Sequence, residues 1–517
     1  MIIGITVFWK RHPALFLALP LLLGAAFSLS KLLIFPLLAA LLMLPFLMPK
    51  LVKNYALFCI ATILLFIFSF AYTTYKKPSY SFSEDSMEGI AYFSLSNIKT
   101  HSSPFQRSYL YEGTIRHFTT LDQRQASKLP CKIFLPIKQE RPLGNGDYLV
   151  QGTLYKKGAA PFVFKPYPAS AWQKVPSSFS LAEWRMQAKE GLRHFLKRKI
   201  HHEKVCAFFS AMATGEINER TLSLEFGKLG LQHILAISGF HFGLLAVFCG
   251  FFLRLFLSPK SAAIVLIFLL SGYFLFIGGA PSVQRAWIAN TLFMCAPFFH
   301  RRARALNTLG IGLITAIFID PLVICHLGFQ LSFLCTAAIL FLYPITEKTC
   351  EIVFPKRTLK MASCMPMAHQ YAYLLSVFFR KAIALTLAVH VVAIPVVLFL
   401  FHKFPLLSLV YNLFFPFWIT ISLFLFLLAV LIGLPLPILG DLLHRFNTGF
   451  TSYLLDLAAN PPAAFEFFLR DQNISLTFLV LYIFVIFTLS IVAQTPRMQN
   501  NPQSAEIKEL HKSRSLT

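Results

Sequence analysis

Apolar runs long enough to cross a bilayer recur along most of the chain, and they constrain its fold more than any other feature. About 20 consecutive apolar residues span the hydrocarbon core as a helix. Hydrophobic residues make up 56% of the 517 residues and charged residues only 13%. This composition is typical of a polytopic α-helical membrane protein. The runs predict twelve spans, near 13–30, 32–49, 54–72, 230–256, 262–280, 283–300, 305–325, 327–344, 381–401, 406–433, 447–465 and 475–493.

Five segments follow from this pattern. They are transmembrane helices in 1–72, an extracytoplasmic β domain in 73–180, an amphipathic interfacial helix in 181–204, a transmembrane core in 205–494 and a disordered cytoplasmic tail in 495–517. Lysines and arginines cluster at one set of span ends, which marks the cytoplasmic side. We therefore expect a multi-pass protein of the inner (cell) membrane with both termini in the cytoplasm.

The external segment alternates apolar and polar residues at the period of a β-strand. The alternation occurs in 113–115, 131–135 and 148–155, and Gly144–Asp147 is a turn signal between two of these stretches. Short strands of this kind predict a small, partly open barrel of OB type. Residues 73–204 hold 21 Lys and Arg against 10 Asp and Glu, a net charge of +11. Two interpretations stay open: a platform for single-stranded nucleic acid, or the solvated surface of a basic protein.

Residues 181–204 predict a basic amphipathic helix that lies on the membrane interface. Its cluster of Lys197, Arg198 and Lys199 suits lipid headgroups as well as DNA. Membrane lipids are therefore expected partners of this segment.

The stretch from Gly230 to Ala246 carries polar residues inside an apolar run. At 100° per residue, His233, Ser238 and His241 fall within one half of a helix surface, beside Gly239. Ionisable groups at membrane depth usually face a bundle interior or a water-filled path. These four residues are therefore candidates for the lining of a polar path.

A second group of polar residues follows the interruption at Gly278–Ser282. Arg285 comes directly after it and is placed to meet phosphate, or to snorkel to the interface. Gln330 and Ser332 either line the same path or form hydrogen bonds between helices. Three further residues are predicted to be structural hydrogen-bond anchors: Asn307, Asp320 and Asn412.

Four blocks of the sequence resemble the ComEC competence proteins, which form the DNA-uptake channel of naturally transformable bacteria. They are 214–243, 278–286, 306–333 and the weaker 404–416. The resemblance implies import of single-stranded DNA, an external DNA receptor protein and a cytoplasmic helicase-like ATPase. His326 stands where the family pattern usually has an acidic residue. Many relatives continue into a metallo-β-lactamase-like domain, and no ligand cluster of that type occurs here, so we expect no nuclease.

Several chemistries lack their sequence signals. There is no GxxxxGK[ST] phosphate loop, so directional force is expected to come from another protein or from the proton gradient. The nine cysteines show no ligand spacing, and we expect neither a metal nor a cofactor. An intramembrane enzyme using Ser238 and His241 lacks a third orienting group, so no enzyme is expected. The alternatives left open are a permease for another anionic solute and a competence fold without DNA uptake. Homo-oligomerisation is also left open.

Overall fold

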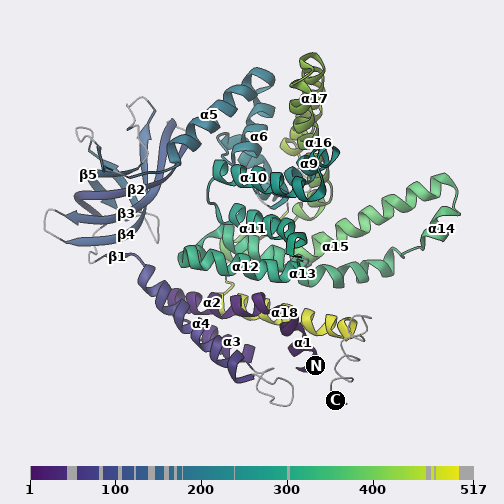
Figure 1. Cartoon of the computed structure of the whole chain (residues 1–517), viewed down its shortest axis with the longest axis horizontal. Coiled ribbons are helices and arrows are strands. Elements are labelled where there is room, and N and C mark those ends of the chain that lie inside the picture. Colours follow the sequence, from purple (N-terminus) through teal and green to yellow (C-terminus); the bar gives the residue numbers. More distant parts are fainter. Residues whose placement is uncertain are drawn as a thin grey trace. The chain divides into compact units, whose positions relative to one another are not determined.

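A computed structural model describes the chain in two compact units, each of which is described by itself (Figure 1). The first unit comprises Met1–Thr74, Gln284–Phe417 and Ala464–Thr517, and the second comprises Tyr75–Val283 and Trp418–Ala463. The described residues are 2–499 except for 44–54, 81–84, 103–106, 121–123, 138–141, 143–145, 157–161, 168–171, 177, 238, 300–302, 462–466 and 471–472.

Eight helices in the described part of the chain are long and apolar enough to cross a membrane. They are α2 (Pro13–Ser30), α4 (Tyr55–Lys76), α9 (Gly239–Phe256), α10 (Pro259–Ile277), α13 (Leu327–Val353), α15 (Met367–Phe401), α16 (Ser408–Gly433) and α18 (Leu476–Gln499). The chain is therefore mostly helical and has the helices of a multi-pass membrane protein. The sequence pattern predicted twelve spans, and eight of them correspond to these full-length helices in the described part of the chain.

The other four predicted spans correspond to helices that are shorter or more polar. α12 (Ala305–Ile319) stops before Asp320 and Pro321, because a proline disfavours helical geometry in the residue before it. α11 (Pro281–Cys295) and α12 have 15 residues each, about 22 Å at 1.5 Å per residue, which is less than the hydrocarbon thickness. α17 (Pro437–Ala459) is long enough, but it buries polar side chains. The described part of α3 is Ile34–Met43, and the rest of that predicted span, 44–49, lies outside the described residues.

The first unit is a helical bundle around two apolar clusters. Phe8, Phe341 and Val392 belong to a cluster shared by α1, α2, α13, α15 and α18, and Leu21 and Leu313 belong to one shared by α2, α12 and α13. α18 continues to Gln499, past the predicted start of the tail, and residues 500–517 lie outside the described residues. The unit's remaining elements are α1 (Ile2–Arg11), η2 (Ala296–Phe299), η3 (Pro321–Cys325), α14 (Leu359–Ser363), β8 (Lys403–Pro405) and β9 (Phe468–Arg470).

Two glycines let helices of the first unit approach closely. A Cβ at Gly24 on α2 would meet the backbone of Phe66 on α4. A Cβ at Gly310 on α12 would meet the backbone of Ala14 and Leu15 on α2. Small residues at helix contacts are typical of membrane bundles, because they bring the two backbones within van der Waals reach.

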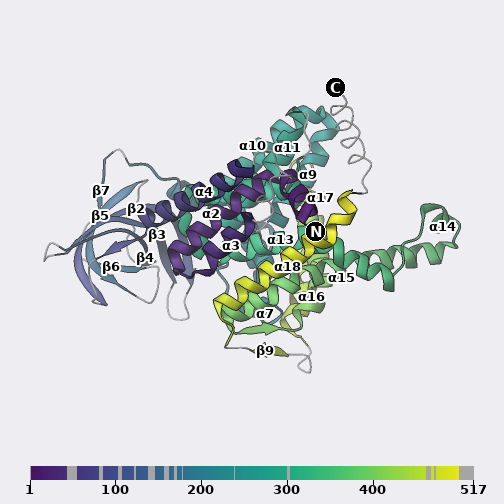
Figure 2. The same ribbon diagram turned by 90° about the horizontal axis from the view of Figure 1, so that it is seen from below.

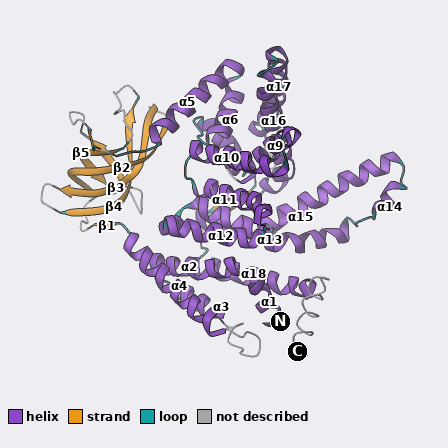
Figure 3. Cartoon of the chain, in the orientation of Figure 1, coloured by secondary structure: helices purple, strands orange, loops and turns teal. Residues whose placement is uncertain are grey.

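A mixed β-sheet domain begins the second unit, and its strands are drawn in orange in Figure 3. The pairings close a ring in the order β2–β3–β4–β6–β5–β2, in which only the β4–β6 pair is parallel. β2 pairs with β3 and with β5, and its register shifts twice between Tyr92 and Asn97. The strands are β1 (Ser79–Tyr80), β2 (Ser86–Ser102), β3 (Arg107–Thr120), β4 (Gln125–Pro136), β5 (Asp147–Tyr155), β6 (Phe162–Pro166) and β7 (Gln173–Lys174).

The helix that follows the sheet is part of the same apolar core. Ala182 and Met186 at the start of α5 (Ala182–Lys199) are buried with strand residues such as Phe93, Ile133 and Phe164. The predicted strands in 113–115, 131–135 and 148–155 lie inside β3, β4 and β5, whereas residues 144 and 145 of the predicted turn lie outside the described residues.

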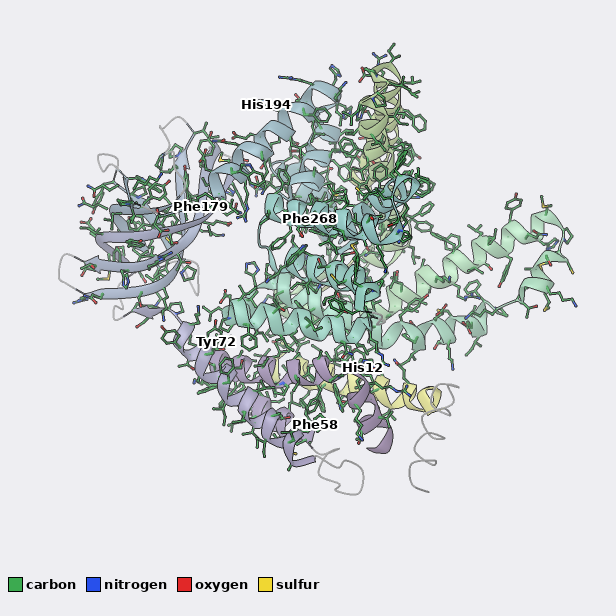
Figure 4. All side chains as sticks on the ribbon, viewed as in Figure 1. His12, Phe58, Tyr72, Phe179, His194 and Phe268 are labelled. Carbon is green, nitrogen blue, oxygen red and sulfur yellow. The ribbon has the colours of Figure 1, made fainter. Side chains whose placement is uncertain are left out.

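Helices complete the second unit. Phe209 on α6 stacks on Phe426 of α16, with ring centroids 4.7 Å apart. Ser422 on α16 is within hydrogen-bond distance of Thr451 on α17, at 2.7 Å. Phe268 on α10 is 74% exposed, as expected of a side chain that faces lipid (Figure 4). The shorter helices are α6 (Glu203–Thr214), α7 (Arg220–Lys228) and α8 (Gln232–Leu235).

We expect Gly310→Ala to destabilise the bundle, because the added Cβ would overlap the backbone of α2, which cannot move away as a side chain can. Overpacking of this kind costs about 1–3 kcal/mol. The measurement is thermal unfolding of the purified protein in detergent. Gly312→Ala is the matched control, because a Cβ there would meet only side-chain atoms at 3.8–3.9 Å. Equal melting temperatures for the two variants would contradict the proposed close approach.

Candidate functional site

The stretch predicted to be one span from residue 230 is broken into two helices. α8 ends at Leu235, Ala236 is extended with φ −78° and ψ 131°, and α9 begins at Gly239. The helical phase is lost at this break, so the predicted common face of His233 and His241 was wrong. Ser238 itself lies outside the described residues. Gly230, with φ 69°, makes the left-handed turn that precedes α8.

The two histidines of this stretch have different surroundings. His233 is exposed. Its Nδ1 is 3.1 Å from the carbonyl oxygen of Gly230, so this contact lies within the turn to which His233 itself belongs. His241 is buried, and its Nε2 is 3.3 Å from the sulfur of Met212 on α6. The fold therefore does not bring these imidazoles together.

A second break separates α10 from α11, at the interruption predicted for Gly278–Ser282. Gly278 has φ 103° and ψ 172°, a conformation that side chains with a Cβ rarely adopt. The Ser282 hydroxyl donates a hydrogen bond of 3.0 Å to the carbonyl of Ile237, which lies in the first break. The two interruptions are thus adjacent in the second unit. Irregular backbone at membrane depth is tolerated where protein covers it or water reaches it.

Basic side chains of α5 satisfy the last carbonyls of α10. Arg185 Nε donates to the carbonyl of Leu275 at 2.7 Å, and Lys189 Nζ donates to that of Ile277 at 3.1 Å. The final carbonyls of a helix have no partner within the helix and carry partial negative charge, so cations stabilise them. These contacts hold the end of α10 in place at the break.

Glu216 neutralises the positive charge that is buried where α5 contacts the end of α10. Its two oxygens accept from Lys189 Nζ at 2.8 Å and from Arg193 at 2.5 Å. The side chains of Lys189 and Glu216 are 3% and 6% exposed. Burial lowers the pKa of Lys189 from its ordinary value, and the carboxylate of Glu216 opposes that shift. We call Arg185, Lys189, Arg193 and Glu216 the junction cluster.

The junction cluster was not predicted from the sequence, because every basic residue of α5 was interpreted as a membrane-surface charge. A signal was present: Arg185, Lys189 and Arg193 repeat every four residues and therefore share one helix face. Farther along α5, Lys199 pairs with Asp441 at 2.8 Å.

Arg285 lies in the first unit, on α11. Its Nε donates to the hydroxyl of Ser332 on α13 at 2.8 Å, and its guanidinium carbon is 5.9 Å from the centre of the Phe333 ring. Within the described part of the chain it forms no ion pair with a carboxylate. Arg285 and Ser332 are thus the two predicted lining residues that the structure joins directly. Gln330 instead donates to the carbonyl of Ile324 at 2.8 Å.

The three predicted anchors make different kinds of contact. Asn307 on α12 donates to the carbonyl of Arg11 at 3.3 Å, which joins it to the end of α1. Asp320 accepts from the backbone N–H of Leu322 at 3.0 Å and caps η3. Asn412 donates to the carbonyl of Ser408 at 2.7 Å within α16, so this bond lies inside one helix and does not link two.

The described side chains suit the weak binding of an anion. A guanidinium held by a hydroxyl and an aromatic ring can offer its remaining N–H groups to phosphate. Within the described residues, no group of three or more His, Cys, Asp and Glu lies close enough to hold a metal ion.

We expect Glu216→Gln to destabilise the second unit strongly, because it leaves Lys189 and Arg193 buried without a counter-charge. Removing one partner of a buried pair costs about 3–5 kcal/mol. Thermal unfolding of the full-length protein measures the effect. Asp441→Asn is the control, because its pair with Lys199 is exposed and such pairs contribute about 1 kcal/mol at most. Similar melting temperatures for both variants would show that Glu216 does not hold the junction.

Comparison with known proteins gives a family match over the same region. A family model described as "Competence protein" matches residues 213–496. ComE operon protein 3 of Bacillus subtilis (strain 168) is 26% identical to this chain over 191 residues, which are 36% of this chain and 21% of that protein. The matched part is thus about a fifth of that relative's length. No solved structure matches the chain. Because the family model covers more than half of the chain, including both helix breaks, Glu216 and Arg285, the chain belongs to the competence protein family.

Proposed function

We propose that this protein conducts single-stranded DNA across the inner membrane during natural transformation. Membership in the competence family supports the biological role. A strand that carries one negative charge per nucleotide cannot cross about 30 Å of hydrocarbon unaided, so DNA import needs a polar path through the membrane. A conduit needs cationic and polar groups that bind each phosphate weakly enough to release it.

The contacts of Arg285 are the observation on which the proposal rests. Lys189 and Arg193 both pair with the carboxylate of Glu216, which explains them as structural charges. Arg285 has a hydroxyl and a ring as partners, and within the described residues no carboxylate neutralises it. A cation kept in an apolar helix without a counter-ion is costly, and such residues mark ion and substrate pathways. A passing phosphate would supply the missing counter-charge.

The β domain supports DNA as the anion. Its strand ring resembles the five-stranded Greek-key barrel of OB domains, which bind oligonucleotides. On the outer face of β5 and β6, Lys165 Nζ lies 5.5 Å from the centre of the Tyr155 ring. Tyr155 and Tyr167 are both 37% exposed. Aromatic rings beside lysines are the stacking platforms of proteins that bind single strands without sequence preference.

The remaining roles belong to partners. We propose an external receptor that delivers DNA, a cytoplasmic helicase-like ATPase that pulls the strand, and lipids around the spans. The chain itself acts as a channel and performs no catalysis. In this arrangement both termini are cytoplasmic and the β domain is external, as the distribution of Lys and Arg indicates.

We expect Arg285→Ala to lower uptake of labelled DNA into the cytoplasm about ten-fold or more, because a hydrogen bond to a charged group contributes about 1.5–3 kcal/mol. Uptake is compared at equal amounts of protein in the membrane. Arg254→Ala is the control, since Arg254 is exposed in the last turn of α9. Uptake at the wild-type level in Arg285→Ala would instead identify Arg285 as a snorkelling side chain.

We expect the full-length protein in nanodiscs to bind a single-stranded oligonucleotide with an affinity that falls as salt rises, with a slope of about −0.7 per phosphate contacted. Tyr155→Ala should weaken binding about ten-fold, because stacking contributes about 1–3 kcal/mol per base. Leu149→Ala is the matched control, since Leu149 lies on the same strand and is 38% exposed but cannot stack. Displacement of the oligonucleotide by small anions would favour a permease for another anionic solute.

A further inference from the structure

α15 is much longer than a membrane span. Its 35 residues reach about 52 Å at 1.5 Å per residue, whereas the hydrocarbon core is about 30 Å thick. The stretch from Lys381 to Phe401 is long enough to cross the bilayer. The part from Met367 to Arg380 therefore extends beyond the crossing segment.

The extension carries an exposed apolar stripe. Met367, Tyr371, Leu374 and Phe378 fall on one face at 100° per residue, and they are 68%, 66%, 62% and 36% exposed. Leu385, which is 42% exposed in the spanning segment, continues the same face. The stripe is thus continuous with a surface that faces lipid.

Three polar side chains of the extension, which lie outside the stripe, bind the connection that carries α14 or the end of α13. Tyr373 Oη accepts from the backbone N–H of Arg357 at 3.0 Å. Gln370 donates to the carbonyl of Met365 at 2.8 Å, and Arg380 donates to that of Phe354 at 3.0 Å. These bonds hold the extension against the connection that carries α14, and the exposure of Met367, Tyr371 and Leu374 shows that the connection leaves the stripe uncovered.

We call residues 351–380 the arm; it comprises the end of α13, the connection with α14 and the extension of α15. Both views show the turn with α14 at the far end of the α13–α15 hairpin (Figures 1 and 2). Ile352 and Val353 in the arm are also 82% and 72% exposed. Residues 343–381 contain six Lys and Arg against two Glu, so an anionic partner is electrostatically favoured.

We propose that the arm lies at the cytoplasmic membrane interface, with its apolar stripe at the boundary between headgroups and acyl chains and its lysines at anionic phospholipid headgroups. An apolar helix face flanked by basic residues is the pattern of interfacial membrane helices. Continuity with the lipid-facing side of α15 favours a bilayer over a protein partner. The side of the membrane follows from the predicted cytoplasmic position of Lys356, Arg357 and Lys360. The proposal does not depend on DNA uptake.

The test places a fluorescent reporter on each face of the arm. Full-length Tyr371→Trp and His369→Trp are reconstituted in vesicles that contain brominated phosphatidylcholine, and the emission of the parent protein is subtracted. His369 is exposed two residues earlier, about 200° around the helix. We expect the added emission at position 371 to be quenched about two-fold more than that at 369, as for a helix lying in the interface. Equal quenching at both positions, or none at 371, would overturn the proposal.

Two further measurements identify which molecule contacts the apolar stripe. Replacing part of the phosphatidylcholine by phosphatidylglycerol should increase quenching at 371, and a lack of any increase would refute the role of anionic headgroups. A benzophenone side chain at position 371 should give no protein adduct in native membranes. Crosslinking to a second copy or to another protein would overturn the assignment to lipid. Leu374→Trp, on the same stripe, replaces Tyr371→Trp if the latter does not fold.

Discussion

Every backbone carbonyl freed at a helix break inside an apolar bundle needs a partner, and the rest of this structure depends on how that requirement is met. At the end of α10, Arg185 and Lys189 supply donors, and Glu216 makes the burial of Lys189 tolerable. The Ser282 hydroxyl serves the first break in the same way. Both interruptions can therefore persist side by side in the second unit, where a span without such partners would close into a continuous helix.

The cations of this membrane protein divide into two kinds by their partners. Lys189 and Arg193 share one carboxylate, and their removal from water is compensated within the chain. Within the described residues, Arg285 contacts the hydroxyl of Ser332 and the ring of Phe333 and forms no ion pair with a carboxylate, which is why we propose that it meets a mobile anion. This difference separates charges that hold the fold from the charge that we propose for transport, and family membership is the reason for proposing DNA as the anion.

The sequence predicted the class of protein, the β segment and the interruption at Gly278, because hydrophobic runs, period-two alternation and glycines are local signals. The prediction from the sequence failed where a non-helical residue interrupts a helix and changes which residues share a face. His233 and His241 fall on one face only if the helix is continuous, and the extended Ala236 makes it discontinuous. It also failed for Lys189, because a basic residue on an amphipathic helix looks the same whether it faces water or a buried Glu216 that lies 27 positions away.

Helix α5 joins two parts of the second unit without an intervening linker. Its first two turns pack into the core of the β domain through Ala182 and Met186, and the same two turns hold the end of α10 through Arg185 and Lys189. Because both sets of contacts lie in the same two turns of one helix, a displacement of the β domain would shift the donors that hold the carbonyls of Leu275 and Ile277, next to Gly278.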